Sequence, residues 1–176
     1  AINHFDVHGI EIPGEININL EKMISRKRSV VDHTVKGIDY LMKKNNITVY
    51  NGLGSFIDST HINIESNKQI VIEAKNTIIA TGSKPASLSF VSIDKERIIT
   101  STQALELKEI PKHLVIIGGG VIGLELGQVY NRLGSKVSVI EYADRITPLM
   151  DASISRELTK VLKRQKINFY LSHTVN

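Results

Sequence analysis

Apolar residues recur along the chain at two spacings, which separate the predicted helices from the predicted strands. Steps of three and four residues predict a long amphipathic helix over Leu20–Lys44, capped by Asn19 and ended by Asn45–Asn46. The same spacing predicts a short helix over Thr102–Leu107 and a helix that begins after Asp151. One more helix has the apolar stripe Ile122, Leu126, Val129, Tyr130 and Leu133, and the stripe after Asp151 is Ile154, Leu158, Val161 and Leu162.

Short apolar runs and one alternating stretch predict the strands. The apolar runs are Ile47–Tyr50, Thr77–Ala80, Leu114–Ile117, Val137–Ile140 and Ile167–Leu171. Continuous apolar runs are typical of parallel strands, which are covered on both faces. Residues 57–73 instead alternate polar and apolar positions around a polar turn, which predicts a β-hairpin. Strands that alternate with helices indicate an α/β fold.

A glycine-rich turn lies between two of these elements. Gly118, Gly120 and Gly123 follow a predicted strand and open a predicted helix, Gly134 ends that helix, and Glu141 ends the next strand. In such a unit the first glycine permits the tight turn, the second admits a pyrophosphate, and the third lets helix and strand pack closely. The helix N-terminus attracts the pyrophosphate, and the acid accepts hydrogen bonds from ribose hydroxyls. The pattern predicts a dinucleotide site; a turn that serves another adenosyl ligand, such as S-adenosylmethionine, is the alternative.

Composition narrows the classes of function. The 176 residues suffice for one domain, or for two small or incomplete ones. The net charge of +4 comes from scattered basic residues with 5% aromatic residues, which argues against a nucleic-acid partner. The chain has no cysteine, and no apolar run approaches the roughly 20 residues of a membrane-spanning helix. Because the chain starts at Ala1 rather than at Met, we expect it to begin partway through a gene product.

Five parts of the chain carry a further signal in combination: Asn51–Gly54, Ile79–Ser83, Ser101–Leu105, Val121–Gly127 and Glu141. Together they resemble the flavoprotein disulfide reductases, and among these the dihydrolipoamide dehydrogenases. The resemblance implies an α/β fold with parts of two Rossmann-like three-layer nucleotide-binding domains. Residues 1–112 would be the later part of an FAD-binding domain with an inserted β-hairpin or meander, and residues 113–176 the first part of an NAD-binding domain.

The resemblance also implies roles for individual residues. Those implied for NAD are Gly118, Gly119, Gly120, Val121, Ile122, Gly123, Glu125, Glu141 and Val175, and those for FAD are Gly52, Gly54, Thr81, Gly82 and Ser83. Plain turns or a strand bulge would account for the FAD set equally well. Glu125 lies between Ile122 and Val129 on the predicted stripe, so we expect it to face the buried side. Its implied role is accessory to catalysis, beside the flavin and paired with a lysine outside this chain. No metal site is expected.

The function implied is that of a flavoenzyme that oxidises dihydrolipoamide with NAD through FAD and a redox disulfide. The partners implied are the lipoyl-bearing protein of a 2-oxo acid dehydrogenase complex and a second copy, in the cytoplasm or the mitochondrial matrix, with no membrane partner. The family's FAD glycine motif, cysteine pair and His–Glu pair are absent from this sequence, so we expect an internal fragment that is inactive alone. The alternatives are another NAD-linked disulfide reductase, an NADH oxidase of the same family, or a non-catalytic nucleotide-binding module.

Overall fold

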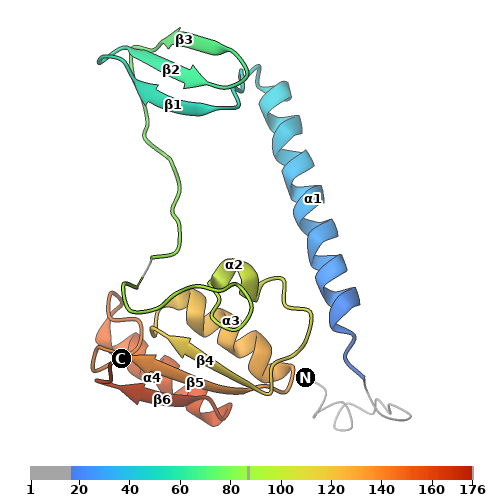
Figure 1. Cartoon of the computed structure of the whole chain (residues 1–176), viewed down its shortest axis with the longest axis vertical. Coiled ribbons are helices and arrows are strands. Elements are labelled where there is room, and N and C mark those ends of the chain that lie inside the picture. The colour runs from blue at the N-terminus through green and yellow to red at the C-terminus, as the bar shows by residue number, and fades with distance from the viewer. Residues whose placement is uncertain (1–16, 87, 176) are drawn as a thin grey trace. The chain divides into compact units, whose positions relative to one another are not determined.

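The computed structural model describes residues 17–86 and 88–175, so the first 16 residues of the expected FAD-binding part lie outside it. The chain divides into two compact units, Ala1–Ser25 with Ser87–Asn176, and Arg26–Ala86. In chain order the elements are α1 (Leu20–Lys44), β1 (Leu53–Phe56), β2 (His61–Glu65), β3 (Gln69–Glu73), α2 (Ser101–Ala104), β4 (His113–Ile117), α3 (Val121–Arg132), β5 (Lys136–Glu141), α4 (Ala152–Arg164) and β6 (Asn168–Leu171) (Figure 1). No helix of the described ranges is long and apolar enough to cross a lipid bilayer.

Strands β4, β5 and β6 form a parallel sheet in that order, which confirms the three strands predicted in this region. Helices α3 and α4 pack on one face of the sheet and enclose its apolar core. The buried residues of this core are Leu124, Val137, Val139, Ile146, Leu162 and Ile167. On the other face Val115, Ile117 and Tyr170 are partly exposed. The sheet, α3 and α4 therefore form a two-layer α/β arrangement.

The side of α3 that meets the sheet differs from the predicted apolar stripe. Ile122 and Val129 are exposed, Ile122 to 62%, whereas Gly127 is buried. A Cβ added at Gly127 would lie 2.8 Å from the Ile116 Cδ1, so the helix backbone itself rests on β4. Glu125 is exposed with its two apolar neighbours, and the expectation that it faces the buried side is wrong for this chain. Spacing identified the apolar positions, but the close backbone contact decides which side of the helix faces the sheet.

The predicted stripe of α4 is also only partly buried. Leu162 is fully buried and Leu158 packs against the core, but Ile154 and Val161 are exposed. Ser155, a polar residue outside the predicted stripe, is fully buried. The helix itself begins where predicted, because the Asp151 carboxylate accepts the Ser153 backbone N–H.

Helix α1 has the predicted bounds, and local hydrogen bonds fix both of its ends. The Asn19 Oδ1 accepts the Lys22 N–H at 2.8 Å. At the other end Asn46 has a φ of 54°, and the Ile47 N–H donates to the carbonyl of Met42 at 2.9 Å. The apolar positions Met23, Val30, Val31, Val35, Ile38 and Leu41 are nevertheless exposed.

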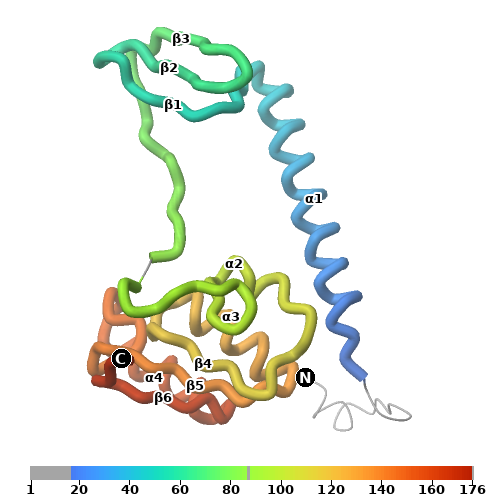
Figure 2. The backbone as a smooth tube through the Cα atoms, in the orientation of Figure 1, coloured from blue at the N-terminus to red at the C-terminus, as the bar shows by residue number. Residues whose placement is uncertain are grey.

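The predicted hairpin is confirmed and gains a third strand. Strands β1, β2 and β3 pair antiparallel in chain order (Figure 2). Ile62 lies between Phe56 and Ile72, and Ile64 pairs with Ile70, so one face of this meander is apolar.

Two predicted strands, Ile47–Tyr50 and Thr77–Ala80, are wrong. Both segments are coil, and the side chains of Ile78 and Ile79 are 90% and 73% exposed. A parallel strand takes its hydrogen bonds from neighbouring strands. Within residues 17–86 and 88–175 no strand pairs with either segment, so the apolar runs remain unpaired. The short helix α2 forms as predicted but ends earlier, at Ala104.

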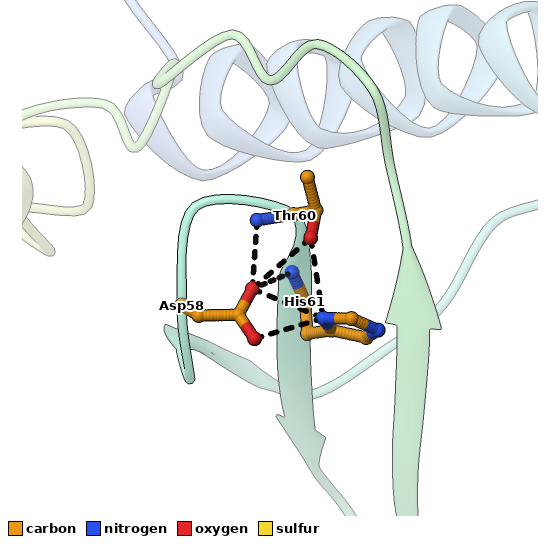
Figure 3. Close-up of polar contacts among 3 residues, drawn as sticks. All are labelled: Asp58, Thr60 and His61. Atoms are coloured by element: carbon orange, nitrogen blue, oxygen red, sulfur yellow. Dashed lines mark hydrogen bonds and ion pairs between the residues drawn. The ribbon is translucent and has the colours of Figure 1, made fainter.

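The turn that leads into β2 is organised by one carboxylate, that of Asp58 (Figure 3). It accepts the backbone N–H groups of Thr60 and His61, each at 2.8 Å, and contacts the His61 Nδ1 at 2.9 Å. These hydrogen bonds, above all that from the Thr60 N–H, hold the pKa of Asp58 well below its ordinary value. The ionised carboxylate is therefore part of the folded turn.

Replacing Asp58 tests this turn through pH. Because its pKa is lowered on folding, the ionised group contributes stability above about pH 4, the ordinary carboxyl pKa, and loses it as the pH falls further. We expect Asp58→Ala to lower the thermal midpoint at pH 7, and the difference from the unmodified protein to shrink below about pH 4. Circular dichroism from pH 7 to 2 measures this. Asp58→Asn, which keeps an acceptor oxygen but cannot ionise, is the matched control. A difference that is constant over the whole range would contradict the role of the charge.

Candidate nucleotide-binding site

The turn between β4 and α3 leaves its backbone open at two glycines. Gly118 has a φ of 101°, a conformation that residues with a Cβ rarely adopt, and its N–H donates to the carbonyl of Ile140 at 2.8 Å. Gly120 is the N-cap of α3, and no side chain caps the helix there. A Cβ added at Gly118 or Gly120 would have no neighbour within 4 Å. The first N–H groups of α3 therefore have no side-chain cap, and the backbone at Gly118 and Gly120 has open space beside it.

Gly123 serves packing instead. A Cβ at this position would lie 2.9 Å from the Ile116 Cγ2 and 3.2 Å from the carbonyl oxygen of Gly118. The third glycine of the motif thus lets α3 approach both β4 and the turn. Gly127, one helical turn later, continues the same contact on Ile116. Together they hold the N-terminus of α3 directly against the end of β4.

The Glu141 carboxylate lies beside Gly119, between the first two glycines of the motif. It accepts the N–H of Gly119 and, at 2.7 Å, the N–H of Ala143. Two backbone donors from different segments therefore orient the carboxylate at the end of β5. A Cβ at Gly119 would lie 3.1 Å from the Glu141 Oε2, so a side chain there would displace the acid.

Two further segments border Glu141. The chain that leaves β6 runs beside it, because the His173 N–H donates to the carbonyl of Glu141 at 3.0 Å and the Ser172 N–H to that of Ala143 at 2.9 Å. Val175 follows two residues later and is partly buried. On the other side, the Thr147 N–H donates to the carbonyl of Gly119 at 2.8 Å. Three loops thus meet at one end of the sheet, around the turn and the acid.

The charges of this arrangement suit a dinucleotide. Free N–H groups and the partial positive charge of the α3 N-terminus favour a phosphate, and the Glu141 carboxylate can accept hydroxyl hydrogen bonds. The open space at Gly118 and Gly120 is where a pyrophosphate would approach the backbone. The residues present therefore fit a pyridine dinucleotide. No group of three or more His, Cys, Asp or Glu side chains within the described ranges could hold a metal ion.

The residues expected at FAD belong to the other unit, Arg26–Ala86. A Cβ at Gly52 would lie 2.6 Å from the carbonyl oxygen of Glu65, so the pairing of the meander by itself accounts for a glycine there. Gly54 pairs with Ile64 within β1 and β2. Thr81, Gly82 and Ser83 are exposed coil, and no hydrogen bond of the described chain joins them to the strands.

Comparison with known proteins assigns this turn to a family. A model of pyridine nucleotide-disulphide oxidoreductases matches residues 7–176. The chain belongs to that family. A dihydrolipoyl dehydrogenase of Bacillus subtilis (strain 168) is 44% identical over 173 residues, which are 97% of this chain and 38% of the relative. One from Trypanosoma brucei brucei is 42% identical over 163 residues, 92% of this chain and 34% of the relative. The chain thus spans about a third of the length of these curated relatives.

Solved structures support the same pyridine nucleotide-disulphide oxidoreductase fold. LpdA from Mycobacterium tuberculosis superposes with a TM-score of 0.79 at 27% identity, over 90% of this chain and 36% of that one. The HOCl-induced flavoprotein disulfide reductase RclA from Escherichia coli gives a TM-score of 0.73 at 30% identity, over 88% and 36%. The α/β Rossmann-like fold class predicted from the sequence is therefore confirmed.

The sequence alone located the glycine turn but missed part of its support. It named Gly118, Gly119, Gly120, Val121, Ile122, Gly123 and Glu141, which the structure brings together at the end of β4 and β5. It assigned no role to Thr147, and it used Gly127 only as part of a family motif. Gly127 follows Gly123 by one helical turn, a spacing that could have shown a glycine face on the helix. Nothing in the pattern of apolar residues around Thr147 signals its contact with Gly119.

An alanine at Gly123 tests the close contact between α3 and β4. The added Cβ must displace the branched Ile116 side chain, and such overpacking costs about 1–3 kcal/mol of unfolding free energy. We expect Gly123→Ala to lower the urea midpoint accordingly. Gly120→Ala is the matched control, because its Cβ meets open space and its φ of −75° suits alanine, so the change should be about 0.5 kcal/mol. Equal losses in the two variants would contradict the packing role of Gly123.

Proposed function

We propose that residues 113–176 are the first part of the NAD-binding domain of an NAD-dependent flavoenzyme, and residues 1–112 the later part of its FAD-binding domain. One observation carries the proposal: the uncapped N-terminus of α3 and the Glu141 carboxylate lie on either side of Gly119. A pyrophosphate on the N–H groups of the turn would leave the adenosine ribose beside that acid. Val175, which follows His173 beside Glu141, is proposed near the adenine.

The two proposed cofactors, NAD and FAD, supply the electron transfer, and the chain supplies binding and orientation. Gly118 and Gly120 bring the backbone to the pyrophosphate, and the first N–H groups of α3 hold its charge. For FAD we propose backbone contacts at Gly52 and Gly54 and at Thr81–Ser83, on the strength of family membership. Because the chain has no cysteine, thiol–disulfide exchange is not performed by these residues.

For the substrate we propose dihydrolipoamide, carried on the lipoyl-bearing protein of a 2-oxo acid dehydrogenase complex, and for the assembly a homodimer. The support is the name dihydrolipoyl dehydrogenase shared by relatives from Bacillus subtilis, Pseudomonas putida and Trypanosoma. Plant relatives are named mitochondrial, so the proposed location is the bacterial cytoplasm or the mitochondrial matrix.

A second disulfide reductase activity is the competing proposal. The chain is 40% identical to a leghemoglobin reductase of Vigna unguiculata and 30% identical to the HOCl-induced reductase RclA. The residues described above would bind nucleotide whichever of the two activities the enzyme has, and they do not select the disulfide or dithiol substrate.

The protein expressed from its complete gene decides between these functions. It should carry bound flavin, seen as visible absorbance, and reduce NAD when dihydrolipoamide is supplied. A flavin-containing protein that reduces another disulfide but leaves dihydrolipoamide untouched would move the assignment to the second activity. A preparation that contains no flavin and does not bind NADH would exclude both activities, and a module that binds another adenosyl ligand would remain.

Replacing Glu141 tests cofactor choice. The carboxylate accepts ribose hydroxyls of NAD and would repel the 2′-phosphate of NADP, so we propose a preference for NAD. Glu141→Ala should reduce the NAD/NADP ratio of kcat/KM by about 10-fold or more, since hydrogen bonds to a charged group are lost. Asp144→Ala is the control: it removes an exposed carboxylate of the same loop, whose side chain pairs with Arg145. Equal use of NAD and NADP by the unmodified enzyme would exclude this role.

Glu125 tests the proposed flavin side of the turn. Its side chain lies on the exposed face of α3 between Ile122 and Val129, where another part of the protein could cover it. We propose an accessory role beside the flavin. In stopped-flow experiments Glu125→Gln should slow flavin reduction by NADH more than it weakens NADH binding. Glu157→Gln, an exposed change on α4, is the control. Reduction rates equal to those of the unmodified enzyme would remove Glu125 from the site.

A further inference from the structure

The segment between Glu141 and α4 holds both backbone polar groups of Gly119. Glu141 accepts the N–H of this glycine, and Thr147 donates its own N–H to the carbonyl at 2.8 Å. Ile146 is fully buried and lies 3.1 Å from where a Cβ of Gly119 would be. Gly119 is thus contacted by three residues of this segment, Glu141, Ile146 and Thr147.

Thr147 makes its contact in an unfavourable backbone conformation. Its φ is 45°, in the left-handed region, which is strained for a β-branched residue. Such a conformation persists only where the surrounding contacts hold it. Thr147 is 4% exposed, and its carbonyl accepts the Met150 N–H at 2.9 Å. Its side chain provides a further restraint.

That restraint is a buried pair of hydroxyl groups. The Thr147 Oγ1 and the Ser155 Oγ are 2.9 Å apart, and the Ser155 hydroxyl also reaches the carbonyl oxygen of Thr147 at 3.2 Å. Both contacts are satisfied when Ser155 donates to that carbonyl and Thr147 donates to the Ser155 Oγ. Ser155 is fully buried in the second turn of α4. The pair therefore ties α4 to Thr147, and through the Thr147 N–H to Gly119.

The direction of one peptide group follows from this tie. In a trans peptide the carbonyl of Gly119 and the N–H of Gly120 point in opposite directions. Because Thr147 holds the carbonyl, the N–H of Gly120 points away from residue 147, and it has no hydrogen-bond partner in the described chain. We propose that Thr147 and Ser155 are positioning residues that fix the Gly119–Gly120 peptide so that the Gly120 N–H is free to bind the pyrophosphate of the nucleotide. This inference rests on the proposed function.

The predicted signature is a loss that depends on the pyrophosphate. In the flavin-loaded enzyme, Thr147→Val and Ser155→Ala should each raise the dissociation constant of NADH and of ADP-ribose by about 3- to 10-fold, the worth of one hydrogen bond. The competition constant of adenosine, which has no phosphate, should stay within twofold. The double variant should lose no more than the larger single variant, because the two hydroxyls act as one unit. Thr147→Ser, which keeps the hydroxyl, should bind NADH as the unmodified enzyme does.

Thr159→Val is the matched control. Its hydroxyl donates to the backbone carbonyl of Ser155 at 2.7 Å, but it makes no contact that leads to Gly119. Equal weakening of NADH binding by Thr159→Val and Ser155→Ala would overturn the inference, as would an equal loss for adenosine, since both indicate general destabilisation. If Ser155→Ala does not fold, Thr147→Val against Thr147→Ser decides the same question. An unmodified enzyme that binds neither NADH nor ADP-ribose would refute the proposed function itself; normal binding with unaffected variants would refute only the positioning role.

Discussion

The close contact of α3 with β4 is the constraint on which the rest of the nucleotide turn depends. It is made by backbone, because Gly123 and Gly127 present no side chain to Ile116. With the helix at this distance, the free N–H groups at its start lie at the carboxyl end of the parallel sheet, where α/β folds bind ligands. A larger residue at either glycine would move that N-terminus, and with it the uncapped N–H donors at the start of the helix. Packing and binding geometry are thus set by the same two positions.

The segment after β5 adapts this packed turn to one kind of ligand. The Glu141 carboxylate accepts the N–H of Gly119, and the Thr147 N–H donates to the carbonyl of the same glycine. Glu141 and Thr147 lie within seven residues of each other. One short segment therefore positions both the acid and the Gly119–Gly120 peptide. Ser155 connects the loop to α4, whose buried Leu162 joins the common core. The site is therefore supported by the hydrophobic core through a short polar chain.

Helix α1 and the meander show which structures local interactions can form without the apolar core of the parallel sheet. Helix α1 has a side-chain cap at Asn19 and a left-handed stop at Asn46, and it forms although its apolar face is exposed. The meander forms from its own cross-strand pairs and the Asp58 turn. The apolar runs at 47–50 and 77–80 also have the composition of strands, but no described strand pairs with them, and they are coil. Local signals suffice for helices and hairpins, whereas a parallel strand requires residues that are distant in sequence.

The sequence by itself determined the elements whose causes are local. The bounds of α1, the β2–β3 hairpin, the stop at Gly134 and the glycine turn follow from spacing, caps and backbone freedom within a few residues. The apolar runs also predicted β4 to β6, but these strands form because each pairs with a strand that is distant in sequence. Tertiary structure alone decided which side of each helix is buried. Ile122 and Ile154 have the spacing of core residues and are exposed, while Gly127 and Ser155 are buried, because the sheet selects the side that approaches most closely. The contact of Thr147 with Gly119 joins residues 28 positions apart through a left-handed backbone, and no pattern in the neighbouring residues encodes it.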